Sequence, residues 1–268
     1  YNSPAPLEAS VTNRVNLPDR SLIAGWVRND TDADGNLSDS EPGIAGVSIT
    51  LFTDPNGDGN ASDGSVIASA TTLSNGYYEL GYFLSNSFVI LETDPLNFLS
   101  TADADGGNPN LIALTTASGV HFTNNIFLDT RLAPVSGQVR FDEDGDGDFD
   151  DPDAGIEGAT VLVFTDPNGD GDPSDGVQVG SHTTTSLGDF VIPNISTGYF
   201  VVVEIDPPGL LSTADSNGAN DNRVPIYMAG GLSSTGTVFL DTTSGLSIEK
   251  SASPPGIWFP NLQARYVI

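Results

Sequence analysis

The sequence predicts an all-β protein built from two tandem Greek-key β-sandwiches. Three observations support this fold class: short alternating apolar segments, turn residues that separate them, and a repeat that covers most of the chain. The long polar stretches carry Gly and Pro where a helix would have to continue, so we expect no helix. With 268 residues, of which 38% are hydrophobic, each half can bury a core of its own.

The repeat has a constant offset and needs no insertion or deletion. Residues 52–59 read FTDPNGDG and recur 112 positions later at residues 164–171. The same offset relates Leu99–Asp103 to Leu211–Asp215, and residues 127–130 to residues 239–242. Because a repeat of this length is one structural unit, we expect one module at 21–131 and a second at 132–243.

The predicted strands follow the alternation of apolar and polar residues. Residues 46–52 alternate in this way, as expected for a strand with one buried face. The turn signal Ser74-Asn75-Gly76 separates two further runs. In the first unit we expect strands at residues 22–28, 46–52, 77–80, 87–92 and 121–128. Short strands broken by Gly, Asp, Asn and Pro are typical of a sandwich.

The charge balance excludes several classes of partner. The chain has 36 Asp and Glu against 8 Lys and Arg, a formal net charge of −28. Nucleic acid and anionic membranes require a basic surface, so neither is expected as a partner. No apolar run approaches the length of a membrane span. Most acidic residues are Asp clustered with Gly and Asn, a pattern that points to metal ligands.

The first acidic loop fits a calcium-binding pattern. Residues 30–41 match D-x-[DN]-x-[DN]-G-x5-E at every position, with Gly35 at the sixth. Calcium takes six to eight oxygen ligands, and alternate residues of a tight loop can supply them. The predicted ligands are Asp30, Asp32, Asp34, Asn36, Asp39 and Glu41, and in the second unit Asp142, Asp144, Asp146, Asp148, Asp151 and Asp153. Since no helices flank the loops, we expect a structural ion rather than a signalling switch.

Two further loops are candidates for calcium. The second has Asp54, Asn56, Asp58, Asn60 and Asp63, repeated as Asp166, Asn168, Asp170, Asp172 and Asp175. The third has Asp94, Asp103 and Asp105, repeated as Asp206, Asp215 and Asn217. Plain hairpin turns also use Asp-Gly and Asn-Gly, and for the third loop a turn closed by its own side chains is an equal alternative.

The acidic loop followed by Pro42-Gly43-Ile44-Ala45-Gly46-Val47 resembles the B-type modules of Gram-positive serine-aspartate repeat adhesins, the SdrD B-like domains. Gly155–Val161 is a second instance, and residues 71–78 and 87–91 fit the later strands of the family. The resemblance covers residues 21–243. It implies an immunoglobulin-like or prealbumin-like sandwich, two or three calcium ions per module and a spacer role.

Related collagen-adhesin modules carry a Lys–Asn isopeptide bond, and this chain departs from that pattern. Its only lysine, Lys250, lies outside both units. Neither module can therefore hold such a cross-link within itself, so stiffening is expected to depend on calcium.

Segments 1–20 and 244–268 lie outside the repeat. Residues 9–17 read as a short strand, and the tail resembles the opening of another bacterial surface repeat domain. One interpretation is a fragment boundary, in keeping with a start at Tyr1 rather than Met. The other is that these strands pair with neighbouring copies of the chain, which would make a homopolymer.

These features predict a non-catalytic, extracellular spacer of a cell-surface stalk or filament. A ligand-binding adhesin is the alternative, with Trp26 or Trp258 as a contact. An enzyme is disfavoured because the only histidines, His121 and His182, are not repeated: the equivalents are Ser233 and Ala70. The expected partners are neighbouring domains or copies of the same surface protein.

Overall fold

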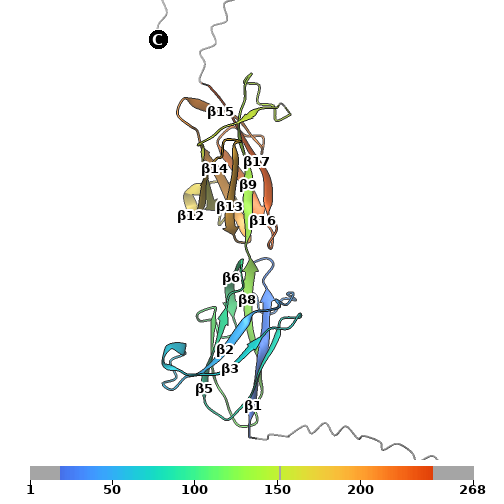
Figure 1. Ribbon diagram of the computed structural model, residues 1–268, viewed down its shortest axis with the longest axis vertical. Coiled ribbons are helices and arrows are strands. Elements are labelled where there is room, and N and C mark those ends of the chain that lie inside the picture. The colour runs from blue at the N-terminus through green and yellow to red at the C-terminus, as the bar shows by residue number, and fades with distance from the viewer. Residues whose placement is uncertain (1–18, 151, 244–268) are drawn as a thin grey trace, which may run out of the picture.

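The computed structural model describes residues 19–150 and 152–243, which form two β-sandwiches arranged end to end (Figure 1). Module 1 contains β1 (Ser21–Asn29), β2 (Ser48–Thr53), β3 (Val66–Thr71), β4 (Tyr77–Phe83), β5 (Ser87–Thr93), β6 (Phe98–Asp103), β7 (Leu111–Thr115) and β8 (Phe122–Arg131). Module 2 contains β9 (Ala133–Phe141), β10 (Ala154–Gly155), β11 (Thr160–Thr165), β12 (Gln178–Thr183), β13 (Asp189–Ile195), β14 (Gly198–Ile205), β15 (Leu210–Asp215), β16 (Arg223–Met228) and β17 (Ser234–Thr243).

Each module packs two sheets face to face. In module 1 the strand orders are β4-β1-β8-β6 and β3-β2-β5-β7. The first and last strands, β1 and β8, run parallel, and the other neighbours are antiparallel. The prediction of an all-β, immunoglobulin-like or prealbumin-like Greek-key sandwich is confirmed.

Module 2 repeats this arrangement and has one additional short strand, β10. Its sheets are β12-β11-β14-β16 and a second sheet in which β9 lies between β17 and β13, with the short β10 also beside β9. The strands β9, β11, β12, β13, β15 and β17 have the bounds of their module 1 counterparts, moved by the offset of the sequence repeat.

The core of module 1 consists of inward-facing residues from both sheets, among them Ile49, Leu51, Ile90 and Phe127. Gly25 recurs at position 137 because β1 and β8 approach very closely. A Cβ atom at Gly25 would lie 1.8 Å from the carbonyl oxygen of Asn125. Only glycine allows this approach.

The modules are joined by a single residue between strands. β8 ends at Arg131, β9 begins at Ala133, and the N–H of Leu132 donates to the carbonyl of Asn97 at 2.8 Å. The buried hydroxyls of Thr130 and Thr197 lie 3.1 Å apart and connect the two modules directly.

The structure adds strands that the alternation did not predict. β3, β6 and β7 are short, and β6 includes Asp103, which the sequence placed in a loop. His121 immediately precedes β8 instead of lying in it. Residues 9–17 and 244–268, where assembly strands were predicted, lie outside the described residues.

The helical content of the described chain consists of two three-residue 3-10 turns, Ala61–Asp63 and Pro173–Asp175. Among residues 19–150 and 152–243, no helix is therefore long enough to cross a membrane.

We predict that Thr72→Val destabilises module 1 by about 1–3 kcal/mol, because it leaves two buried backbone groups without their side-chain hydrogen-bond partner. The buried hydroxyl of Thr72 donates to the carbonyl of Ile44 at 2.7 Å and accepts from the N–H of Val47 at 2.9 Å. Urea unfolding measures the change. Thr72→Ser keeps the hydroxyl and is the matched control. Equal stabilities of the Val and Ser variants would contradict the prediction.

Candidate calcium centres

Loop 1 connects β1 to β2 and is organised around a buried carboxylate. Asp30 is 1% exposed, and its oxygens accept the N–H groups of Asp34 at 3.2 Å and Gly35 at 3.0 Å. The hydroxyl of Thr101 on β6 donates to the same carboxylate at 2.6 Å. A buried anchor of this kind positions the exposed acidic residues that follow it.

The predicted ligands of loop 1 come together in space. Oxygens of Asp30, Asp32 and Glu41 lie within 4.8 Å of one another, as do those of Asp32, Asp34 and Asp39. Asn36 lies beside them and donates its side-chain N–H to Asp39 at 2.8 Å.

The copy in module 2 has the same design. Asp142 is 2% exposed and accepts the N–H groups of Gly145 at 2.7 Å and Gly147 at 3.0 Å. Oxygens of Asp142, Asp144 and Asp146 lie within 4.8 Å of one another. One carboxylate oxygen of Asp153 is buried without a partner. Asp151 lies outside the described residues.

Loop 2 joins β2 to β3 around a second buried anchor. Asp54 is 4% exposed and accepts the N–H groups of Gly57 at 2.9 Å and Gly59 at 3.1 Å. Oxygens of Asp54, Asp58 and Asp63 lie within 4.8 Å of one another. The side-chain oxygens of Asn56 and Asn60 instead accept backbone N–H groups within the loop.

In module 2 the anchor of loop 2 is Asp166, which is 3% exposed and accepts the N–H groups of Gly169 and Gly171, both at 2.9 Å. Asp172 lies 3.6 Å from Arg223, which is the one ion pair of the described residues. Almost all of the acidic residues described here therefore lack a basic partner.

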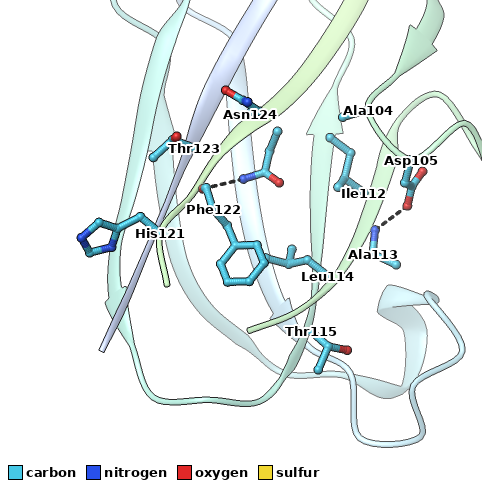
Figure 2. A pocket seen from close by; sticks show the side chains of 11 residues that line it. Ala104, Asp105, Ile112, Ala113, Leu114, Thr115, His121, Phe122, Thr123 and Asn124 are labelled. Carbon is cyan, nitrogen blue, oxygen red and sulfur yellow. Dashed lines mark hydrogen bonds between the residues drawn. The ribbon is translucent and has the colours of Figure 1, made fainter. Parts of the chain in front are cut away.

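The third predicted loop is closed mainly by its own contacts. The carboxylate of Asp103 accepts the N–H of Gly106 at 2.8 Å, and Asp105 accepts the N–H of Ala113 at 2.7 Å (Figure 2). In module 2, Asp215 accepts the N–H of Asp221 at 2.9 Å, and Asn217 donates to the carbonyl of Arg223 at 2.8 Å. Burial raises the pKa of Asp103 to about 6.

Sequence reasoning missed a group of acidic residues inside each sandwich. Glu92 on β5 and Asp129 on β8 are 2% and 0% exposed, as are their equivalents Glu204 and Asp241. Burial, with the charges of Asp129 and Asp94, raises the pKa of Glu92 to about 10. Burial likewise raises the pKa of Glu204 to about 9.

A signal for these residues was present in the alternation. Glu92 follows Phe88 and Ile90 at the inward-facing positions of β5, and Asp129 follows Phe127 on β8. Acidic residues at core positions, kept in both repeats, indicate a buried polar site.

An open hollow between β7 and the start of β8 contains no catalytic arrangement. Its lining includes Leu114 and Phe122, with His121 and Asp105 on opposite sides (Figure 2). His121 accepts the N–H of Leu22 at 3.1 Å. The other histidine, His182, lies on β12 of module 2.

The chain is similar in sequence to a known domain family and to staphylococcal proteins. Residues 22–127 match the family model of the SdrD B-like domain. Serine-aspartate repeat-containing protein F of Staphylococcus epidermidis is 26% identical over 208 residues, which cover 75% of this chain and 12% of that protein. Serine-aspartate repeat-containing protein E of Staphylococcus aureus strain USA300 is 26% identical over 233 residues, 80% of this chain and 19% of that protein.

Two solved pilin structures are also similar. The shaft pilin SpaA from Lactobacillus rhamnosus GG is 13% identical and aligns over 86% of this chain and 99% of the pilin chain, with a TM-score of 0.34. GBS52, the minor pilin of Streptococcus agalactiae, is 14% identical over 87% of this chain and 100% of the pilin chain, with a TM-score of 0.35.

The chain spans only between 12% and 19% of the length of the two curated relatives named above. By these matches the chain is a β-sandwich protein of the cell surface, and residues 22–127 of its module 1 match the SdrD B-like domain family.

Proposed function

We propose that this chain is a non-catalytic spacer of an extracellular stalk or filament, stiffened by bound calcium. The observation that carries the proposal is the recurrence of loops 1 and 2 at the same places in both modules, each around a buried aspartate. Each buried aspartate fixes the shape of its loop through backbone N–H groups, and the exposed acidic residues around it offer the oxygen ligands that calcium takes.

Calcium suits these loops better than other metals. The donors are carboxylate and amide oxygens, which hard cations prefer, and the chain has no cysteine. Calcium also accepts the irregular, many-ligand geometry that a flexible acidic loop provides. We expect two ions per module from loops 1 and 2.

The net negative charge of the chain gives an energetic reason for cation binding. A net charge of −28 disfavours the compact state through self-repulsion, and the described residues contain one ion pair. Divalent ions in the loops offset part of this repulsion at the positions where it is strongest.

The position of loop 1 explains how an ion would stiffen a tandem. Thr31 in loop 1 contacts the turn of module 2 that contains Gly230, where a Cβ atom would lie 2.6 Å from the carbonyl oxygen of Thr31. Gly231 lies in the same way against the side chain of Arg131. Ordering of loop 1 by calcium would therefore restrain the contact between the modules.

Assembly into a polymer belongs to the same proposal. Copies would join by strand addition through residues 1–20 or 244–268, most of which lie outside the described residues. The match of residues 22–127 to the SdrD B-like domain, together with the small share of the serine-aspartate repeat-containing proteins that this chain spans, supports a role between neighbouring domains.

A ligand-binding adhesin is the second candidate, and one observation favours it. Tyr199 and Tyr227 are 56% and 51% exposed, with ring centroids 4.8 Å apart on adjacent strands. The equivalent residues of module 1 are Ser87 and Thr115. An exposed aromatic pair in one module only is typical of a contact surface.

If the chain is a spacer only, the double variant Tyr199→Ala, Tyr227→Ala should leave the attachment of beads coated with the chain to cells unchanged. A loss of attachment in the double variant, with Leu187→Ala as a control at another exposed position of module 2, would favour the adhesin instead.

We predict that calcium raises the thermal unfolding midpoint of the purified chain strongly relative to a chelator. Each site adds about 2.7 kcal/mol when free calcium is a hundredfold above its dissociation constant. Differential scanning calorimetry of the full chain measures the shift, and magnesium is the control ion. An unchanged midpoint would mean that the loops are turns without metal.

The anchors and the exposed ligands should respond differently to substitution. Asp58→Ala should weaken calcium binding and leave the midpoint in chelator nearly unchanged, because Asp58 is exposed. Asp54→Ala should lower the midpoint in both conditions, since it frees the N–H groups of Gly57 and Gly59. Calorimetry with and without chelator compares them. Identical behaviour of the two variants would contradict the assignment of an anchor.

A further inference from the structure

The last layer of the module 1 core, on the side of the junction with module 2, is acidic instead of apolar. Glu92 from one sheet and Asp129 from the other face each other across the sandwich, where alternation would place two more apolar residues. Both carboxylate oxygens of Glu92 and both of Asp129 are buried without a hydrogen-bond partner. Four such oxygens in a core are very costly unless something neutralises them.

Three polar residues complete this acidic chamber, which we define as Glu92, Asp94, Ser100, Asn110 and Asp129. Oxygens of Glu92, Asp94 and Asp129 lie within 4.8 Å of one another. The hydroxyl of Ser100 lies 2.7 Å from Oδ1 of Asp94 and 2.6 Å from Oδ1 of Asn110. One hydroxyl has one hydrogen, so it cannot donate to both oxygens.

Module 2 repeats the chamber with the same five residue types: Glu204, Asp206, Ser212, Asn222 and Asp241. Here the buried oxygens without a partner are both of Glu204, both of Asp241, Oγ of Ser212 and Oδ1 of Asn222. The side-chain amide of Asn222 donates to Asp206, which leaves its own oxygen free. Two copies of the same set of oxygen-bearing side chains argue against an accident of packing.

A proton shared by the two acids is the competing explanation. The raised pKa of Glu92 means that the chamber would hold a proton if no cation were present. One proton supplies one hydrogen bond, however, and the remaining carboxylate, hydroxyl and amide oxygens would still lack donors. A divalent cation can satisfy them all at once.

We propose that each acidic chamber binds a calcium ion, at a site separate from loops 1 and 2. The ion would be held by carboxylates from both sheets and would clamp the sandwich at one end. In module 1 that end faces the junction: Asp94 begins the turn whose Asn97 carbonyl accepts the N–H of Leu132. This inference deepens the proposed function, on which it rests, by adding a clamp inside each module.

Native mass spectrometry of the full chain in calcium, with titration calorimetry for affinity, tests the proposal. Glu92→Gln and Glu204→Gln should each remove one bound ion, and the double variant should remove two. Glu79→Gln makes the same charge change at an exposed position of β4 and should keep every ion. Asp129→Asn is a second variant of the chamber and should lose the same ion as Glu92→Gln.

The midpoint in chelator separates a cation site from a proton-sharing pair. If the chamber binds calcium, Glu92→Gln in chelator should unfold at the same or a higher temperature than the unaltered chain, because a buried acid is removed. If Glu92→Gln instead lowers the midpoint in chelator and keeps every bound ion in calcium, the chamber is a proton-sharing acid pair and the proposed calcium site is overturned.

The two proposals fail in different ways. If Glu92→Gln and Asp129→Asn keep all ions while Asp58→Ala loses one, the chamber is overturned and the calcium-stiffened spacer stands. If the unaltered chain binds no calcium, both proposals are overturned together.

Discussion

The constraint on which the rest of this molecule depends is the repulsion among carboxylates that have almost no basic partners. With 36 acidic against 8 basic residues, ion pairs within the chain cannot balance the charge. The fold concentrates this charge into loops and one internal layer per module. Under the proposed function, cations at those positions would offset the repulsion, and the rigidity of the chain would depend on the ion concentration around it.

Buried anchors and exposed ligands have separate roles in the acidic loops. Asp30 and Asp54 close their loops through backbone N–H groups, so each loop has a shape before any ion binds. Under the proposed function, the exposed acidic residues would then complete a shell of oxygens around a calcium ion. Preformed loops lose less conformational entropy on binding, which favours affinity and a single geometry.

The two modules have one scaffold and differ at its surface. Their strands match in position, and both have the acidic chamber, yet Tyr199 and Tyr227 occur in module 2 only. The shared features concern the core and the loops, while the exposed tyrosines distinguish the surface of module 2. A direct junction through Leu132, Thr130 and Thr197 leaves little chain between the modules to bend.

The sequence alone determined the fold class, the repeat and the acidic loops, because these depend on local alternation and on ligand spacing along the chain. It did not reveal β3, β6 and β7, which lie at sheet edges and bury few residues, so that their alternation of apolar and polar residues is weak. Only the tertiary structure brought Glu92 and Asp129 together, from strands in opposite sheets. Contacts between the two sheets of a sandwich join residues that are far apart in sequence. No local sequence pattern therefore shows which inward-facing acidic residues will meet.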